Sequence, residues 1–216
     1  MDYEAARSLR ASVVLTGPLL SRFHSIAFPH PGGDLIGERP VDFFLEGFKK
    51  MGATVEVSED EYRVSAPEGL TGADIFFRWV SVTATETLMM AAILAKGTTI
   101  LRNVAMEPEV ADLAAFLVSA GAKISGIGTP TLSIEGGGML RPTKPHRVIP
   151  DRIEAGSFLI LGAIAAKELR ISNCEPEHLR MLIELLSRSG ASISEEKDAL
   201  VIRGGGDTLR KGMTLK

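Results

Sequence analysis

EPEVADLAAFLVSAGAKISGIGTPTLSIEG, residues 107–136, contains the unit that decides the fold of this chain. Its first half places Val110, Leu113 and Leu117 at helical spacing, behind a proline suited to a helix start. Gly121 then predicts the end of the helix, because glycine readily adopts the left-handed conformation found there. The second half alternates as two short strands joined by a turn. The stretch therefore predicts a helix followed by a β-hairpin.

The same pattern occurs three times along the chain. A Gly-Ala pair closes each helix at Gly52, Gly121 and Gly190, a constant interval of 69 residues. The two other copies of the helix and hairpin are RPVDFFLEGFKKM (39–51) with TVEVSEDEYRVSA (54–66), and EPEHLRMLIELLSRS (175–189) with SISEEKDALVIRG (192–204). We therefore expect a fold built from repeated copies.

A second and more apolar helix is expected ahead of each amphipathic one. The three segments are ARSLRASVVLTGPLLSRF (6–23), ATETLMMAAILAKG (84–97) and IEAGSFLILGAIAAKE (153–168). A helix that is apolar on nearly every side belongs in an interior, so all three are expected to be enclosed by sheets and outer helices. Short strands at 98–104 and 168–174 join the two helices of a copy, and each contains a matching asparagine, Asn103 or Asn173. The predicted class is α/β, made of βαβαββ units around buried helices.

Composition limits the classes of protein to which the chain can belong. Of its 216 residues 45% are hydrophobic and 24% are charged, which is typical of a globular protein. A net charge of −3 without a Lys/Arg run argues against nucleic-acid binding, and the apolar runs are too short to cross a membrane. The start of the chain does not resemble a signal peptide, so a cytoplasmic location is expected. Cys174 is alone and the four histidines lack metal-binding spacing, so we expect neither a disulfide nor a metal or other cofactor.

PGGDLIGERPVD, residues 31–42, is the strongest candidate for chemistry. Gly32 and Gly33 allow Asp34 to lie on a mobile loop, and Arg39 offers a planar guanidinium that matches phosphate or carboxylate. This combination suggests chemistry on a phosphorylated substrate. Considered alone, Gly-Gly-Asp is also compatible with an ordinary turn, and the arginine with a solvated surface charge.

This stretch closely resembles the catalytic loop of the UDP-N-acetylglucosamine enolpyruvyl transferase family, whose usual form is PGGC followed by IGxRPVD. Asp34 stands where that family has cysteine. SVTATE (81–86) is similar to the family's SVGATE loop, and VIPDRIEAGSF (148–158) is nearly identical to its crossover between two lobes. The resemblance implies an inside-out α/β barrel, or prism, of which this chain carries about three of six units. Residues 1–147 would be the later two units of the first lobe and 148–216 one unit of the second, in a partial chain.

The resemblance also implies an activity. Enolpyruvyl would pass from phosphoenolpyruvate to the 3-hydroxyl of UDP-N-acetylglucosamine with release of phosphate, as the first committed step of peptidoglycan synthesis. That step serves cell-wall biogenesis, cell shape and cell division. The implied partners are these two small molecules, with neither nucleic acid nor membrane, and no oligomeric state is predicted. A chain lacking the family's other catalytic groups is expected to turn over very slowly or not at all.

Ten residues receive roles through the resemblance. Asp34 would be the general acid, Arg39 would contact phosphoenolpyruvate, and Arg10 would face the nucleotide sugar. The other implied contacts are to the uridine, from Pro40, Val41, Asp42 and Phe43, and to the diphosphate, from Ser81, Val82 and Thr83. Three positions depart from the family, which prefers glycine at Thr83, lysine in many members at Trp79 and often histidine at Phe44.

Several alternatives remain open from the sequence. Serine and threonine before an apolar helix are often simple caps, and the charged residues of DRIE (151–154) are explained nearly as well by a helix start as by a cleft. The chain could also be a degenerate remnant that binds a UDP-sugar or serves a structural role. A transferase acting on shikimate phosphate shares the fold but lacks the PGG loop.

Overall fold

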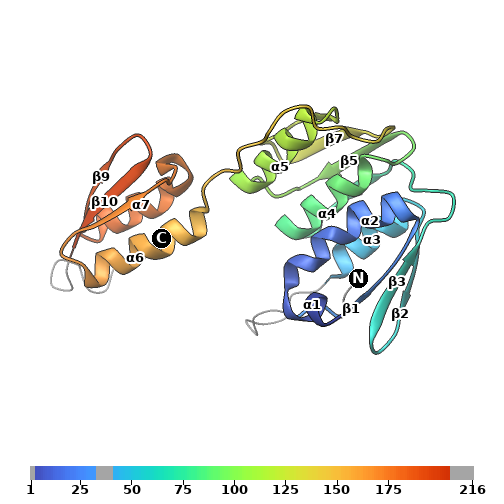
Figure 1. Ribbon diagram of the computed structural model, residues 1–216, viewed down its shortest axis with the longest axis horizontal. Coiled ribbons are helices and arrows are strands. Elements are labelled where there is room, and N and C mark those ends of the chain that lie inside the picture. The colour runs from blue at the N-terminus through green and yellow to red at the C-terminus, as the bar shows by residue number, and fades with distance from the viewer. Residues whose placement is uncertain (1–2, 33–40, 205–216) are drawn as a thin grey trace. The chain divides into compact units, whose positions relative to one another are not determined.

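The computed structural model describes residues 3–32 and 41–204. The chain divides between Arg147 and Val148 into two compact units, and each has its own hydrophobic core (Figure 1). The first unit contains two copies of the repeat and the second contains one. In none of the described helices is the apolar stretch long enough to span a membrane.

The first unit begins with a helical segment and a hairpin. Its elements are α1 (Tyr3–Ser8), the 3-10 helix η1 (Arg10–Leu15), α2 (Thr16–Phe23), β1 (Ser25–Pro29), α3 (Asp42–Lys50), β2 (Thr54–Val57) and β3 (Glu61–Ser65). The second copy follows with β4 (Asp74–Phe76), α4 (Val82–Ala92), β5 (Thr98–Arg102), α5 (Pro108–Ser119), β6 (Lys123–Ser125) and β7 (Thr131–Glu135). This second copy has the predicted βαβαββ order in full.

The second unit repeats the later part of that order. It consists of α6 (Arg152–Ala165), β8 (Leu169–Ser172), the 3-10 helix η2 (Pro176–Leu179), α7 (Arg180–Arg188), β9 (Ser192–Glu195) and β10 (Ala199–Arg203). Helices α6 and α7 pack on the strands of its sheet (Figure 1). The two helices and the sheet enclose Leu159, Ala163, Leu200 and Ile202.

The three sheets share one strand order, which confirms the repeat. The orders are β1-β3-β2, β5-β7-β6 and β8-β10-β9, and the middle sheet adds β4 in parallel beside β5. Equivalent backbone positions also share a conformation. The stop glycines have φ angles of 91° at Gly52, 106° at Gly121 and 108° at Gly190, and the paired asparagines have 58° at Asn103 and 53° at Asn173. The repeated residues are therefore those that accept a left-handed backbone.

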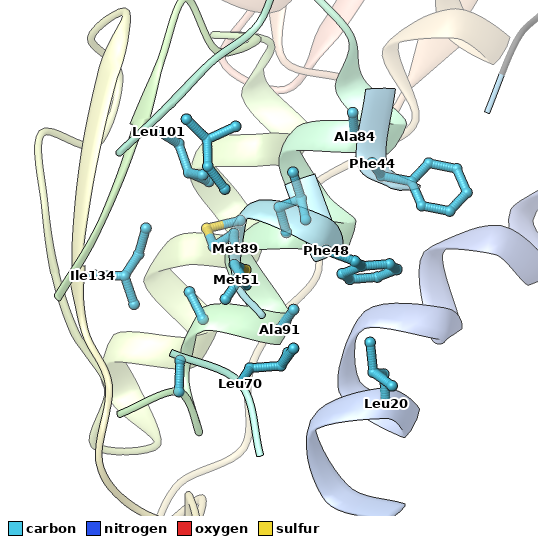
Figure 2. Close-up of a cluster of buried hydrophobic side chains, with 14 of the residues drawn as sticks. Leu20, Phe44, Phe48, Met51, Leu70, Ala84, Met89, Ala91, Leu101 and Ile134 are labelled. Atoms are coloured by element: carbon cyan, nitrogen blue, oxygen red, sulfur yellow. The ribbon is translucent and has the colours of Figure 1, made fainter. Parts of the chain in front are cut away.

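Helix α4 forms the centre of the first unit, where it packs against α2, α3 and α5 (Figure 1). Leu88, Met89 and Ala91 are fully buried, and Figure 2 shows side chains of α2, α3 and the sheet around Met89 and Ala91. The α2 and α4 backbones approach closely, because a side chain added at Gly17 would collide with the carbonyl oxygen of Thr87. The Ser21 hydroxyl also donates a 2.7 Å hydrogen bond to the carbonyl of Ala91. The prediction of an enclosed apolar helix is confirmed here.

Two of the three predicted apolar helices differ from expectation. The first is divided into α1, η1 and α2, with breaks at Leu9 and after Leu15. Pro18, which has no N–H to donate to the preceding turn, lies in the first turn of α2. The third, α6, is not enclosed within its own unit: Phe158 is 48% exposed and Leu161 52%. The second unit has no second apolar helix among its described residues to cover that face. The positions of β1 and β4 were not predicted from the sequence, since these strands are only five and three residues long.

Candidate functional site

A pocket of about 480 Å³ in the first unit brings together three segments that are distant in sequence. Its lining comes from η1 (Arg10, Ala11, Val14), from α3 (Phe43, Phe44) and from the start of α4 with the residue pair before it (Val80, Ser81, Thr83, Ala84, Glu86). The lining combines apolar and aromatic side chains with hydroxyls and two opposite charges. This volume and composition fit a small organic molecule with a charged or polar group.

The charges in the pocket lining belong to Arg10 and Glu86. Glu86 is half-buried on the first turns of α4, and burial raises the pKa of its carboxyl. The nearby carboxylates of Glu109 and then Glu107 raise that pKa further. A neutral Glu86 carboxyl can donate a hydrogen bond as well as accept one.

Local hydrogen bonds explain how the start of α4 is shaped. Ser81 is the N-cap, and its side-chain oxygen accepts a 3.2 Å hydrogen bond from the N–H of Ala84. The Thr85 hydroxyl donates to the Ser81 carbonyl at 2.7 Å and accepts from the Ala105 N–H at 3.1 Å. The Thr85 hydroxyl is thus engaged within the fold, whereas the hydroxyl hydrogen of Ser81 can still be donated to a ligand.

The loop that leads from β4 into α4 is held at its base. The N–H of Phe77 donates to the Arg102 carbonyl at 3.0 Å, and the Asn103 side-chain amide donates to the Phe77 carbonyl at 2.9 Å. Arg78 in this loop lies 3.5 Å from the Glu46 carboxylate and 4.0 Å from that of Asp42. The chain therefore enters α4 along a fixed path, with the pocket on one side of it.

The structure brings together four of the ten residues predicted for the site. Arg10, Phe43, Ser81 and Thr83 line the pocket. Three others are near it in sequence but are not part of its lining: Val41 is buried, Asp42 begins α3 and pairs with Arg78, and Val82 is half-buried in α4. The remaining three, Asp34, Arg39 and Pro40, lie outside the described residues.

No place in the pocket was predicted for Glu86, Phe44, or Ala11 and Val14 of η1. Thr83 and Glu86 are three residues apart, which places them on one face of a helix, so a carboxylate on an otherwise apolar helix was a usable signal.

At the start of α6, the Asp151 carboxylate accepts hydrogen bonds of 2.8 Å and 3.0 Å from the N–H groups of Ile153 and Glu154. Asp151 is therefore a helix cap. Among the described residues, no three His, Cys, Asp or Glu side chains are grouped as metal ligands.

Comparison with known proteins identifies the family. The family model described as EPSP synthase (3-phosphoshikimate 1-carboxyvinyltransferase) matches residues 1–215. The chain belongs to the EPSP synthase family.

Curated relatives within the EPSP synthase family carry a more specific name. A UDP-N-acetylglucosamine 1-carboxyvinyltransferase of Solibacter usitatus is 42% identical over 217 residues, which cover 98% of this chain and 51% of the relative. A protein of the same name from Acidobacterium capsulatum is 46% identical over 205 residues, covering 94% of this chain and 47% of the relative. The chain thus spans about half the length of these relatives.

Solved structures of similar proteins confirm the predicted fold. The enolpyruvyl transferase NikO from Streptomyces tendae matches with a TM-score of 0.69 and 23% identity, over 90% of this chain and 47% of that one. An EPSP synthase from Acinetobacter baumannii matches with a TM-score of 0.64 and 19% identity, over 91% and 46%. The α/β fold with repeated units is therefore that of the enolpyruvyl transferases.

Proposed function

We propose that this chain forms part of an enzyme that transfers enolpyruvyl from phosphoenolpyruvate to the 3-hydroxyl of UDP-N-acetylglucosamine. The observation that supports this is the pocket itself. Arg10, Phe43, Ser81 and Thr83, each expected from the resemblance to contact the nucleotide sugar, come from three separate segments and line one cavity. The names of the curated relatives favour the same substrate over a shikimate phosphate.

The pocket residues suit the parts of such a substrate. The start of α4 offers backbone N–H groups and the Ser81 hydroxyl to a diphosphate, and Arg10 offers a guanidinium fork to an anionic or sugar oxygen. Phe43 provides an apolar wall for a ring. Within the larger protein, residues 1–147 would supply the later two units of the first lobe and residues 148–216 a unit of the second.

The reaction needs a proton at the methylene carbon of phosphoenolpyruvate. The sugar hydroxyl then attacks the adjacent carbon, a C–O bond forms, and loss of phosphate and of a methyl proton restores the vinyl group. We assign the first proton transfer to Asp34 and the binding of phosphoenolpyruvate to Arg39. This reaction is the first committed step of peptidoglycan synthesis, so the proposal also places the protein in cell-wall biogenesis in the cytoplasm.

Calorimetry on the 216-residue chain tests the substrate. UDP-N-acetylglucosamine should bind and shikimate 3-phosphate should not, and Arg10→Ala should weaken binding by about tenfold or more, the cost of one charge-assisted hydrogen bond. Arg22→Ala is the matched control, because Arg22 is exposed on α2 and lies over the Phe23 ring instead of lining the pocket. Preferential binding of shikimate 3-phosphate, or an equal effect of both substitutions, would contradict the proposal.

Turnover of the full-length protein tests the acid. Asp34→Ala should abolish phosphate release from phosphoenolpyruvate and UDP-N-acetylglucosamine, and Asp34→Cys should retain it, because cysteine is the residue usual in this family. Asp60→Ala, in the exposed turn between β2 and β3, should have no effect. Full activity of Asp34→Ala would remove Asp34 from the mechanism. Tight binding of the UDP-sugar without phosphate release by the unsubstituted protein would favour a non-catalytic binding role.

A further inference from the structure

Trp79 is the only tryptophan in the chain, and its side chain is not part of the hydrophobic core of the first unit. It is 69% exposed, the most of any aromatic residue among the described positions. Single exposed aromatic side chains are common on protein surfaces, and Phe23 and Phe76 are also exposed in this chain. The exposure of Trp79 therefore bears on function only together with its place beside the pocket.

The exposure of Trp79 is not that of a loose loop. Phe77, two positions before Trp79, is held by two hydrogen bonds to its backbone. Ser81, two positions after Trp79, is held by its N-cap hydrogen bond. One neighbour, Arg78, lines a small groove with Phe43, and the other neighbour, Val80, lines the main pocket with Phe43. The backbone of Trp79 is therefore held at the rim of the pocket, between Arg78 and Val80.

The repeated fold does not require tryptophan at this position. Ser81 and Asp151 are the N-caps of the equivalent helices α4 and α6, and they are 70 residues apart, as are Asn103 and Asn173. By the same interval Ile149 is the counterpart of Trp79. The third copy thus makes the same cap and the same apolar helix without an indole. The start of the helix therefore does not account for an aromatic ring at position 79.

We infer that Trp79 stacks on the planar base of a nucleotide ligand at the open end of this pocket and so determines specificity for it. The inference rests on the proposed function. With the diphosphate at the start of α4, a sugar would extend toward Arg10 and Glu86, which leaves the base for the rim beside Phe43 and Trp79. Stacking of a base on an aromatic side chain contributes about 1–3 kcal/mol, or roughly five- to 150-fold in affinity.

A single tryptophan makes the test direct. UDP, UDP-N-acetylglucosamine and inorganic pyrophosphate are titrated into the 216-residue chain, and binding is followed by tryptophan fluorescence and by calorimetry. The two uridine ligands should quench the fluorescence of Trp79, whereas pyrophosphate should bind without quenching it. Trp79→Ala should weaken both uridine ligands by about tenfold and leave pyrophosphate unchanged. Trp79→Phe should retain most of the affinity, because a ring remains.

Phe23→Ala provides the matched control, since Phe23 is an exposed aromatic residue at the end of α2 that does not line the pocket. Circular dichroism verifies that each variant is folded. If wild-type and Trp79→Ala chains bind UDP-N-acetylglucosamine equally, the inference fails while the proposed function stands. If no uridine ligand binds the wild-type chain, both fail. Equal weakening of pyrophosphate by Trp79→Ala would assign the residue a structural role and would also overturn the inference.

Discussion

The side chain of Thr85 accepts a 3.1 Å hydrogen bond from the backbone N–H of Ala105, and both residues are buried. The bond joins α4, which begins at the pocket, to the chain that leaves β5. Thr85→Val keeps the shape of the side chain but leaves the Ala105 N–H without its acceptor. We expect the free energy of unfolding to fall by about 1–3 kcal/mol, measured by urea denaturation of the purified chain.

Thr87 offers the matched control for this prediction. Its hydroxyl oxygen is also fully buried on α4 but has no hydrogen-bond partner among the described residues. Thr87→Val removes an unsatisfied polar group, so it should leave stability unchanged or raise it by about 1–2 kcal/mol. Similar losses for the two variants would show that packing, not the Thr85 bond, sets the stability of this part of α4.

Leu88 and Phe158 occupy equivalent positions of α4 and α6, yet Leu88 is fully buried and Phe158 is 48% exposed. A side chain added at Gly47 of α3 would collide with Leu88, so the packing there is tight. Leu88→Ala should therefore destabilise the first unit by about 2–5 kcal/mol. Phe158→Ala should change the stability of the second unit by less than about 1 kcal/mol. A large loss from Phe158→Ala would show that another part of the protein covers this face of α6.

Much of the fold was predictable because the same residues recur at equivalent positions of each copy. Gly52, Gly121 and Gly190 end helices in each copy, and Asn103 and Asn173 take the same left-handed turn. Such positions depend on local backbone preference, which a sequence shows directly. The exposure of α6 could not be predicted in this way. Whether an apolar helix is covered depends on which other segments lie against it, and that is a property of the assembled fold.

The candidate site was predictable only in part, for the same reason. Arg10, Phe43 and Ser81 were identified through motifs, but their meeting in one pocket depends on how η1 and α3 pack beside α4. The Thr85 hydroxyl belongs to the same SVTATE motif, but the fold engages it with Ala105. Glu86 ends the SVTATE motif but was given no role there, although it follows Thr83 by three residues of helix and therefore lies on the same helix face.

His146 fixes the segment that leads to the boundary between the two units. Its Nε2 lies 3.0 Å from the Asp112 carboxylate of α5, and its ring contacts that of Phe116 edge to face. His146→Ala removes both contacts and should release this segment from α5. Trypsin should then cut after Arg147 severalfold faster than in the wild-type chain, because local opening limits proteolysis of a held segment. Mass spectrometry of the fragments identifies the bond.

His146→Gln tests which contact matters, since glutamine can still donate a hydrogen bond to Asp112 but has no ring for Phe116. Partial protection by this variant would divide the effect between the two contacts. Cleavage at the wild-type rate in His146→Ala would mean that the segment is held by other residues.

The raised pKa of Glu86 makes the free energy of unfolding depend on pH. Burial, with help from Glu109 and Glu107, raises the pKa of its carboxyl in the folded chain, so the folded state binds this proton more tightly than the unfolded state does. The contribution of Glu86 to stability therefore falls as the pH rises from the ordinary pKa of a glutamate through the raised value, and it stays unfavourable at neutral pH. Glu86→Gln cannot ionise. We expect this variant to be more stable than the wild-type chain near pH 8 and to lose that advantage near about pH 4, in urea denaturation at both values.

Glu107 provides a second measurement of the same effect. Glu107→Gln removes a charge that contributes less to the raised pKa than burial does, so its pH-dependent gain should have the same sign and a smaller size. Because other carboxylates titrate in both chains, the relevant quantity is the difference between variant and wild type at each pH. An identical difference at the two pH values would show that Glu86 is ionised without penalty in the folded chain. In that case the carboxyl would face the pocket as an ordinary anion, and an anionic ligand placed beside it would be repelled.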